Sequence, residues 1–251
     1  MRIAFLLVSF ALAGACNAST PDGGGAAGGT NGGGGERTEA SGPRSSRDFQ
    51  VGAFERINLA GPMDVQVRVG AQPSVRAEGR EGLDRLEIVV VDGELRIGTV
   101  RGTSGPLRDI VVHVTVPALT AASLNGPGDI DIDRVRGARF AAAVNGPGNL
   151  SFGELRVETA SFAVNGPGGI RAAGGAPRAE AVLSGPGNMR LDGFETRDAS
   201  VSLTGPGHID LRATGAVSVT LSGPGNVTVT GGARCSVTSS GPGSVRCPAG
   251  G

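Results

Sequence analysis

Seven copies of Gly-Pro-Gly in the second half of the chain constrain its fold more than any other feature. Their first glycines lie 18 to 20 residues apart, at Gly126, Gly146, Gly166, Gly185, Gly205, Gly223 and Gly241. Self-similarity at such a period is typical of solenoids, propellers and arrays. Proline fixes its own φ, and the glycine after it is expected to take the positive φ of a type II turn.

Apolar and polar residues alternate on both sides of each turn. The position two residues before the first glycine holds Leu124, Val144, Val164, Leu183, Leu203, Leu221 and Ser239. The position four residues after it holds Ile130, Leu150, Ile170, Met189, Ile209, Val227 and Val245. This period of two predicts a strand on each flank, with one side buried. A second break is expected about nine residues later, at Gly137, Gly153, Gly175, Gly193, Gly215 and Gly231.

Two architectures fit these repeats, a parallel β-solenoid and a meander of antiparallel hairpins. Near-constant residue types at each position favour the solenoid, because like residues then stack coil on coil. A solenoid also leaves unpaired strands only at its two ends. The chain has no Trp or Tyr and 8 Phe, which suits a thin layered core. We therefore predict an all-β fold, a parallel β-helix or β-solenoid with 18–20 residues per coil and Gly-Pro-Gly turns.

The segment before the repeats also predicts strands. Residues 56–59, 64–69, 86–91 and 110–116 alternate or are continuously apolar, and Asp92-Gly93 is typical of a hairpin turn. Gly61-Pro62-Met63-Asp64 resembles a degenerate copy of the repeat.

The amino terminus predicts export. A positive start, the apolar run 3–12 and Ala13-Gly14-Ala15-Cys16 describe a secretory signal that is too short to span a membrane. Cys16 directly after small residues indicates a bacterial lipoprotein signal, residues 1–16, although Ala13 stands where Leu is usual. An ordinary cleaved signal is the alternative. Asn17 favours the outer membrane as the destination. Residues 17–48 are rich in Gly and Ser and predict a disordered linker.

A family resemblance covers residues 50 to 247. Phe54-Glu55-Arg56-Ile57, residues 91–97 and residues 114–119, leading into Gly126-Pro127-Gly128-Asp129, are together similar to the head GIN domain family of auto-transporter adhesins. The resemblance implies a β-helical domain, placed at 49–248 with its repeat array at 118–247, and a surface or periplasmic role. The family's molecular function is unassigned, so it implies no catalytic residues.

Few residues suggest a site for nucleic acid, a metal or a cofactor. Positive and negative side chains balance at 23 each, which argues against a nucleic-acid partner. His113 and His208 lack neighbouring ligands at metal-binding spacing, so no metal or cofactor is expected. Asp129, Asp131 and Asp133 share an outward strand face, where a calcium site competes with a solvated surface, and we favour the surface.

Catalysis is the alternative to a binding role. A carbohydrate-active enzyme, either a polysaccharide lyase or a hydrolase, needs paired acids about 5 to 10 Å apart. Asp131 and Asp210 share a column four coils apart, about 19 Å at the usual strand spacing. We therefore predict a non-catalytic protein.

A polar edge is the candidate binding surface. The residues directly before each Gly-Pro-Gly are Asn125, Asn145, Asn165, Ser184, Thr204, Ser222 and Ser240. Their side chains either hydrogen-bond to the turn backbone or bind a glycan or an envelope protein.

Two pairings test the predicted register. Cys235 and Cys247 lie six residues before and after Gly241, which predicts a disulfide in an oxidising compartment. Arg190 with Asp210, and Asp192 with Arg212, are expected to be neighbours one coil apart.

These features together predict a lipid-anchored outer-membrane lipoprotein of the cell envelope that presents a β-solenoid for adhesion. Its expected partners are the membrane, through the lipid, and a glycan or envelope protein. A structural or sensory periplasmic module is the third possibility.

Overall fold

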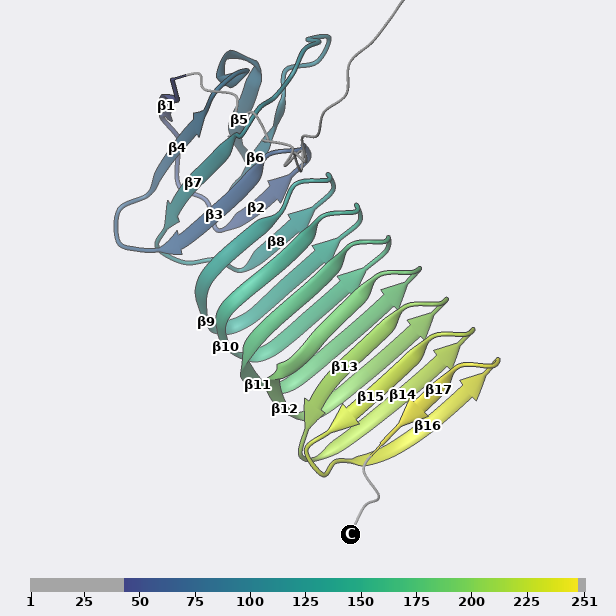
Figure 1. The fold of residues 1–251 in the computed structure, drawn as a ribbon. Helices are drawn as coiled ribbons and strands as arrows, with labels where there is room; N and C mark the ends of the chain where they lie inside the picture. The colour runs from purple at the N-terminus through teal and green to yellow at the C-terminus, as the bar shows by residue number, and fades with distance from the viewer. Residues whose placement is uncertain (1–42, 248–251) are drawn as a thin grey trace, which may run out of the picture. The chain divides into compact units, whose positions relative to one another are not determined.

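The computed structural model describes residues 43–247, which belong to one compact unit built almost entirely of β-strands (Figure 1). The predicted signal peptide, 1–16 with Cys16, lies outside the described residues, and so does 17–42 of the predicted linker. Strand β1 (Ser45–Phe49) pairs with β4 (Ser74–Gly79), so residues 45–48 belong to the fold. The linker predicted at 17–48 therefore extends too far into the folded domain.

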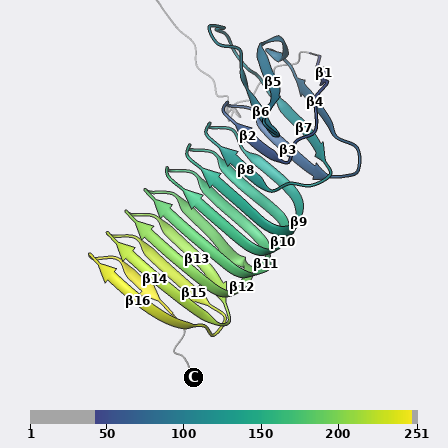
Figure 2. The ribbon, with the colours of Figure 1, turned by 180° about the vertical axis from the view of Figure 1, so that it is seen from behind.

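The repeats form a parallel β-solenoid, as predicted, in which each coil crosses two facing sheets (Figures 1 and 2). The first coils consist of β8 (Ala121–Leu124), β9 (Ile130–Val144), β10 (Asn149–Val164), β11 (Gly169–Ser184) and β12 (Asn188–Thr204). The later coils consist of β13 (His208–Ala213), β14 (Ala216–Ser222), β15 (Asn226–Thr230), β16 (Arg234–Ser240) and β17 (Ser244–Arg246). The predicted second break separates strands only in these later coils, since β9 to β12 continue through the bend.

The predicted apolar columns line the space between the two sheets. Leu124, Val144 and Val164 are fully buried, and so are Ile130 and Leu150 in the facing sheet. Edge-to-face contacts join Phe140 with Phe152 and Phe162 with Phe194, at centroid distances of 5.2 and 5.4 Å. The aliphatic stack with a few aromatic contacts accounts for a thin, continuous core.

The glycines of the turns are needed for a different reason from the one predicted. The second glycine never takes a positive φ in the described turns, so the type II prediction is wrong. In the last four turns it is the first glycine that does, with φ between 110° and 117°. A Cβ on the second glycine would lie within 3.0 Å of a backbone oxygen in the coil before it, as at Gly148, Gly207 and Gly225. Close stacking of successive turns therefore excludes any side chain there.

The segment before the repeats adds one more coil and a closed end. It contains β2 (Arg56–Leu59), β3 (Asp64–Val69), η1 (Leu83–Arg85), β5 (Leu86–Val91), β6 (Glu94–Thr99) and β7 (Val111–Val116). Leu59 pairs with Leu124 and Val65 with Ile130, so the degenerate copy at residues 61–64 stacks on the first full repeat, as its sequence predicted.

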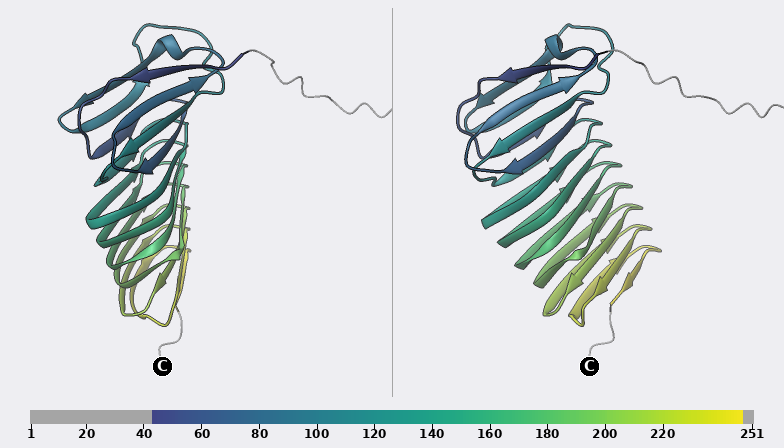
Figure 3. Two further views of the ribbon diagram at one scale, coloured as in Figure 1. Left: turned by 90° about the vertical axis from the view of Figure 1, so that its left-hand side faces the viewer. Right: turned by 60° about the vertical axis from the view of Figure 1, so that its left-hand side comes forward.

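Antiparallel strands close this amino-terminal end of the stack. β1 pairs with β4, β4 with β7 and β5 with β6 in antiparallel fashion. The predicted hairpin turn joins β5 to β6, with positive φ at Asp92 and Gly93. The parallel pattern thus begins behind an antiparallel cap, which Figure 3 shows at the end opposite the last coil.

Bulges near the second bend absorb the differences in coil length. The register of β12 on β13 shifts between Leu191 and Glu195, because the coil that contains β12 carries extra residues there. Arg190 and Asp210 are register partners, as predicted. The predicted neighbours Asp192 and Arg212 are not, since the bulge places Glu195 opposite Arg212, where the two form an ion pair at 3.1 Å.

The last coil carries the predicted disulfide between Cys235 and Cys247, whose Cα atoms are 6.4 Å apart. Among residues 43–247, no helix has the length and hydrophobicity needed to cross a membrane.

Candidate functional site

The predicted polar edge lies along one side of the turns, and its asparagines bond to each other. The Nδ2 of Asn145 donates to Oδ1 of Asn125 at 2.8 Å, and the Nδ2 of Asn165 donates to Oδ1 of Asn145 at 2.9 Å. Asn58, which the sequence reasoning missed, accepts from Asn125 at 3.0 Å and extends this asparagine ladder by one coil. The degenerate repeat at residues 61–64 was the signal that could have found it. The amides stack between coils, and the predicted bonds to the turn backbone are absent from the described residues.

The remainder of the edge is in register but less connected. Ser184 pairs with Thr204, Thr204 with Ser222, and Ser222 with Ser240. Within residues 43–247, no side-chain hydrogen bond joins these hydroxyl groups. Their polar atoms are therefore available to solvent or to a ligand.

A second polar column follows each turn on the other side. Its members are Asp64, Asp129, Asn149, Gly169, Asn188, His208, Asn226 and Ser244. Oδ1 of Asp129 accepts from the backbone N–H of Asn149 at 2.7 Å, and Oδ1 of Asn226 accepts from the Ser244 hydroxyl at 2.7 Å. Polar side chains of this column thus join neighbouring coils at both ends of the repeat array.

Gly169 interrupts this column and opens a notch. The notch has a volume of about 350 Å³, and its polar lining includes Asp129, Asn149, Ser151, Arg171, Asn188 and Arg190. A Cβ at position 169 would lie 2.9 Å from the Asn188 carbonyl oxygen and 3.2 Å from Oδ1 of Asn149. Position 169 is therefore too crowded for a Cβ, and the notch lies where other coils of this column carry a side chain.

Two arginines lie side by side at this notch. Arg171 and Arg190 are register partners on neighbouring coils, and both are exposed. Neither has a carboxylate within 4.0 Å among residues 43–247. The nearest acid along the column, Asp210, places Oδ1 2.8 Å from Nε2 of His208. Like charges on adjacent strands repel each other, so this pair favours an anion.

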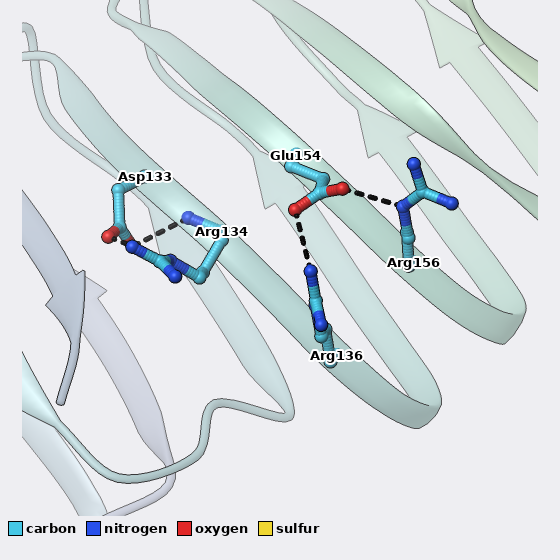
Figure 4. Close-up of polar contacts among 5 residues, drawn as sticks. All are labelled: Asp133, Arg134, Arg136, Glu154 and Arg156. Atoms are coloured by element: carbon cyan, nitrogen blue, oxygen red, sulfur yellow. Dashed lines mark hydrogen bonds and ion pairs between the residues drawn. The ribbon is translucent and has the colours of Figure 1, made fainter. Parts of the chain in front are cut away.

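A second arginine pair in the same protein shows how such repulsion is offset. Arg136 and Arg156 are also register partners, and Glu154 lies between them (Figure 4). Oε1 of Glu154 accepts from Nε of Arg156 at 2.6 Å, and Oε2 accepts from Arg136 at 3.2 Å. These bonds, that from Arg156 first, lower the pKa of Glu154. The Arg171 and Arg190 pair lacks an equivalent carboxylate among the described residues, and the notch leaves room for one from outside.

The metal and catalytic candidates are not brought together. Oδ1 of Asp133 accepts from the backbone N–H groups of Val69 and Arg134, and Asp129 is bonded as described above. No cluster of three or more His, Cys, Asp or Glu side chains occurs in residues 43–247. His113 lies in β7 and His208 in β13, and Asp131 and Asp210 lie four coils apart in one column. These positions give no support to a calcium site, a zinc site or a paired-acid mechanism.

Comparison with known families gives one match. The family described as "Putative auto-transporter adhesin, head GIN domain" matches residues 53–233, which include the asparagine ladder, the notch and all of the cap except β1. No curated protein matches the chain.

Several solved structures share the fold. A "putative adhesin" from Bacteroides fragilis aligns with a TM-score of 0.77 and 20% identity, over 82% of this chain and 97% of that one. A "putative adhesin" from Parabacteroides merdae gives 0.68 and 19%, over 82% and 96%. A "putative lipid binding protein" from Parabacteroides distasonis gives 0.65 and 19%, also over 82% and 96%.

Proposed function

The chain belongs to the head GIN domain family of auto-transporter adhesins, and from this we propose that it is a non-catalytic, adhesin-like module of the cell envelope. Its anchor in this proposal is a lipid on Cys16, and its ligand is an acidic glycan bound at the notch. The family and the solenoid fold support an adhesin-like, non-enzymatic role and a location at the cell envelope or surface.

The pair Arg171 and Arg190 is the observation that carries the glycan proposal. Two guanidinium groups on adjacent strands suit a carboxylate, which each can bind through two parallel hydrogen bonds. Asn149 and Asn188 flank the same notch and offer amide donors and acceptors for sugar hydroxyls. A polymer of uronic acids combines both chemistries. The polar edge from Asn125 to Ser240 supplies further contacts along the stack.

Binding to polygalacturonate, with neutral dextran as the control polymer, tests the ligand. Arg171→Gln and Arg190→Gln are each expected to weaken binding about 10- to 100-fold, the range for hydrogen bonds to a charged group. Arg136→Gln removes the same charge from a pair that has its own carboxylate, and it should leave binding unchanged. Added salt should weaken the wild-type interaction.

Three results would overturn the glycan proposal. One is equal binding of dextran and polygalacturonate, and another is an equal loss in all three variants. The third is release of reducing ends or unsaturated products by the purified protein, which would favour the carbohydrate-active enzyme instead.

Membrane fractionation tests the anchor independently. Cys16→Ser removes the acceptor for the lipid, and the protein is expected to move from the membrane fraction to the soluble fraction. Several acyl chains on one cysteine anchor a protein stably, whereas a single chain binds only marginally. Retention of the Cys16→Ser protein in membranes would exclude a lipid on that residue as the anchor.

A further inference from the structure

The last coil of the solenoid leaves two strand edges without a partner in residues 43–247. β16 pairs on one side with β14, and β17 pairs on one side with β15. The opposite end of the stack is closed by the antiparallel strands β1 and β5 (Figures 1 and 3). An unpaired strand presents a row of N–H and C=O groups to which another strand can add.

The free edge carries few of the features that usually prevent such pairing. β16 has one charge, at Arg234, and neither a proline nor a charge in the rest of Arg234–Ser240. Val237 lies in an inward column, yet it is 45% exposed, whereas its register partner Val219 is 1% exposed. The apolar core therefore opens to solvent at this end.

The disulfide holds the two free strands so that their middle residues lie opposite each other. It fixes Cys235 of β16 opposite Cys247, just after β17, with Cα atoms 6.4 Å apart. The two strands run in opposite directions from this point toward the turn at Gly241. Two residues along from each cysteine lie Val237 and Val245, which therefore face each other across the core. A line through both valines crosses the centres of both free strands.

We propose that a second copy of this chain pairs with this end, through a two-fold axis that is parallel to the line from Val237 to Val245 and lies just outside the two free strands. A two-fold axis there makes each strand antiparallel to its own copy, so both sheets continue across the interface. In the register centred on Val237, Arg234 lies opposite Ser240 of the second copy. In the register centred on Val245, Arg246 lies opposite Ser244 of the second copy. No arginine faces its own copy, and the exposed Val237 side chains meet on the axis.

The closed end explains why this pairing stops at two copies. A head-to-tail filament would need the free edge of one molecule to add to the amino-terminal end of the next. That end presents β1 and β5, the outermost antiparallel strands, and β1 carries Arg47 and Asp48. The charges on β1 oppose further addition to that sheet, and the two-fold axis already uses the free edge of both copies. The pairing therefore gives a closed dimer.

The two-fold axis places the amino-terminal ends of the two solenoids at opposite ends of the dimer. Combined with the anchor on Cys16, this arrangement lets copies on two facing envelopes pair tip to tip. This last step rests on the proposed function, whereas the pairing of the edges does not.

Sedimentation equilibrium of the full chain carrying Cys16→Ser tests the pairing without lipid-driven association. We expect a concentration-dependent dimer, with small-angle scattering giving roughly twice the monomer length. Val237→Lys brings two ammonium groups together on the axis, and Val245→Lys does the same in the other sheet. Each is expected to raise the dissociation constant at least tenfold. Ser218→Lys, one coil earlier and on an outer face, is the matched control and should leave it unchanged.

A parent protein that stays monomeric at about 100 μM would overturn the proposal, because its dimer would then be too weak to measure as a specific association. So would larger open assemblies, or a folded Val237→Lys or Val245→Lys protein that dimerises as strongly as the parent. Circular dichroism establishes that each variant is folded. If both lysine variants unfold, hydrogen exchange of the parent protein still decides, since the β16 amides should exchange more slowly in the dimer than in the dilute monomer. Equal exchange at both concentrations would overturn the proposal. Failure of polygalacturonate binding would leave this result untouched, so the two proposals fail separately.

Discussion

Glu154 supplies the only negative charge within hydrogen-bonding distance of both Arg136 and Arg156 in residues 43–247. The bonds from these arginines lower its pKa below the ordinary value of 4.5. The stabilisation is therefore present above that value and is lost as the pH falls through the lowered pKa of the folded state. Glu154→Gln is expected to reduce the melting temperature at pH 7 and low salt. Thermal melts should show the two proteins converging as the pH falls through the lowered pKa of Glu154, and a difference that does not depend on pH would contradict this assignment.

Gly148 lies at a position that has no room for a side chain, whereas Gly137 lies at one that does. A Cβ at Gly148 would lie within 3.0 Å of the Gly128 carbonyl oxygen, whereas one at Gly137 meets nothing within 4 Å. Gly148→Ala is expected to destabilise the fold by about 1–3 kcal/mol, the usual range for overpacking. Gly137→Ala should stabilise it by about 0.4–1 kcal/mol, because it restricts the unfolded chain. Urea denaturation measures both, and equal effects would mean that close stacking of the turns is not the reason for glycine.

The asparagine ladder is the element whose contribution can be dissected coil by coil. Asn145 makes two ladder bonds and Asn165 makes one, to Asn145. A neutral hydrogen bond contributes about 0.5–1.5 kcal/mol, and these exposed bonds belong at the lower end. The loss of stability in chemical denaturation should therefore follow the order Asn145→Ala, Asn165→Ala, Ser222→Ala. A loss for Ser222→Ala as large as that for Asn145→Ala would show that the ladder adds no stability.

The disulfide stabilises an element that has little core of its own. The inward column ends at Ser239, and Val237 is largely exposed, so the last coil has few apolar contacts. The cysteines are 12 residues apart, and closing such a loop contributes about 3 kcal/mol in the chain-entropy model. Cys235→Ser with Cys247→Ser should speed hydrogen exchange in β16 and β17 while the earlier coils stay protected. Uniformly faster exchange would indicate that the last coil does not unfold separately.

Regular elements could be predicted from the sequence wherever each coil repeats the one before it. The inward columns, the register of Arg190 on Asp210 and the pairing of Cys235 with Cys247 all follow from counting residues from the turn. The count fails at the second bend, because bulges at residues 152–155 and 191–195 add residues to some coils and not to others. Register is set there by local packing, which periodicity does not encode.

At the scale of the whole domain, the sequence predicted the solenoid but not its antiparallel cap. The hairpin of β5 and β6 was predicted from Asp92-Gly93, but β1 and β4 belong to no repeat, so nothing in their order indicates the strands with which they pair. The notch was missed for a similar reason. In the sequence, Gly169 looks like one more turn residue. Only the structure places it between its register partners Asn149 and Asn188. The notch at Gly169 can be recognised only when the side chains at the same position in the neighbouring coils are known.

Stacking by hydrogen bonds between coils also determines how the domain responds to tension. These bonds run along the stack, so a pull between its two ends loads the coils in series and peels them one at a time. Each detached coil releases 18 to 20 residues, or about 60 Å of extended chain. The disulfide resists peeling at the tip, where Cys235 and Cys247 keep their loop closed. Under load, a tethered solenoid of this kind would lengthen in steps. Each step would absorb work and lower the tension on an attachment at the tip.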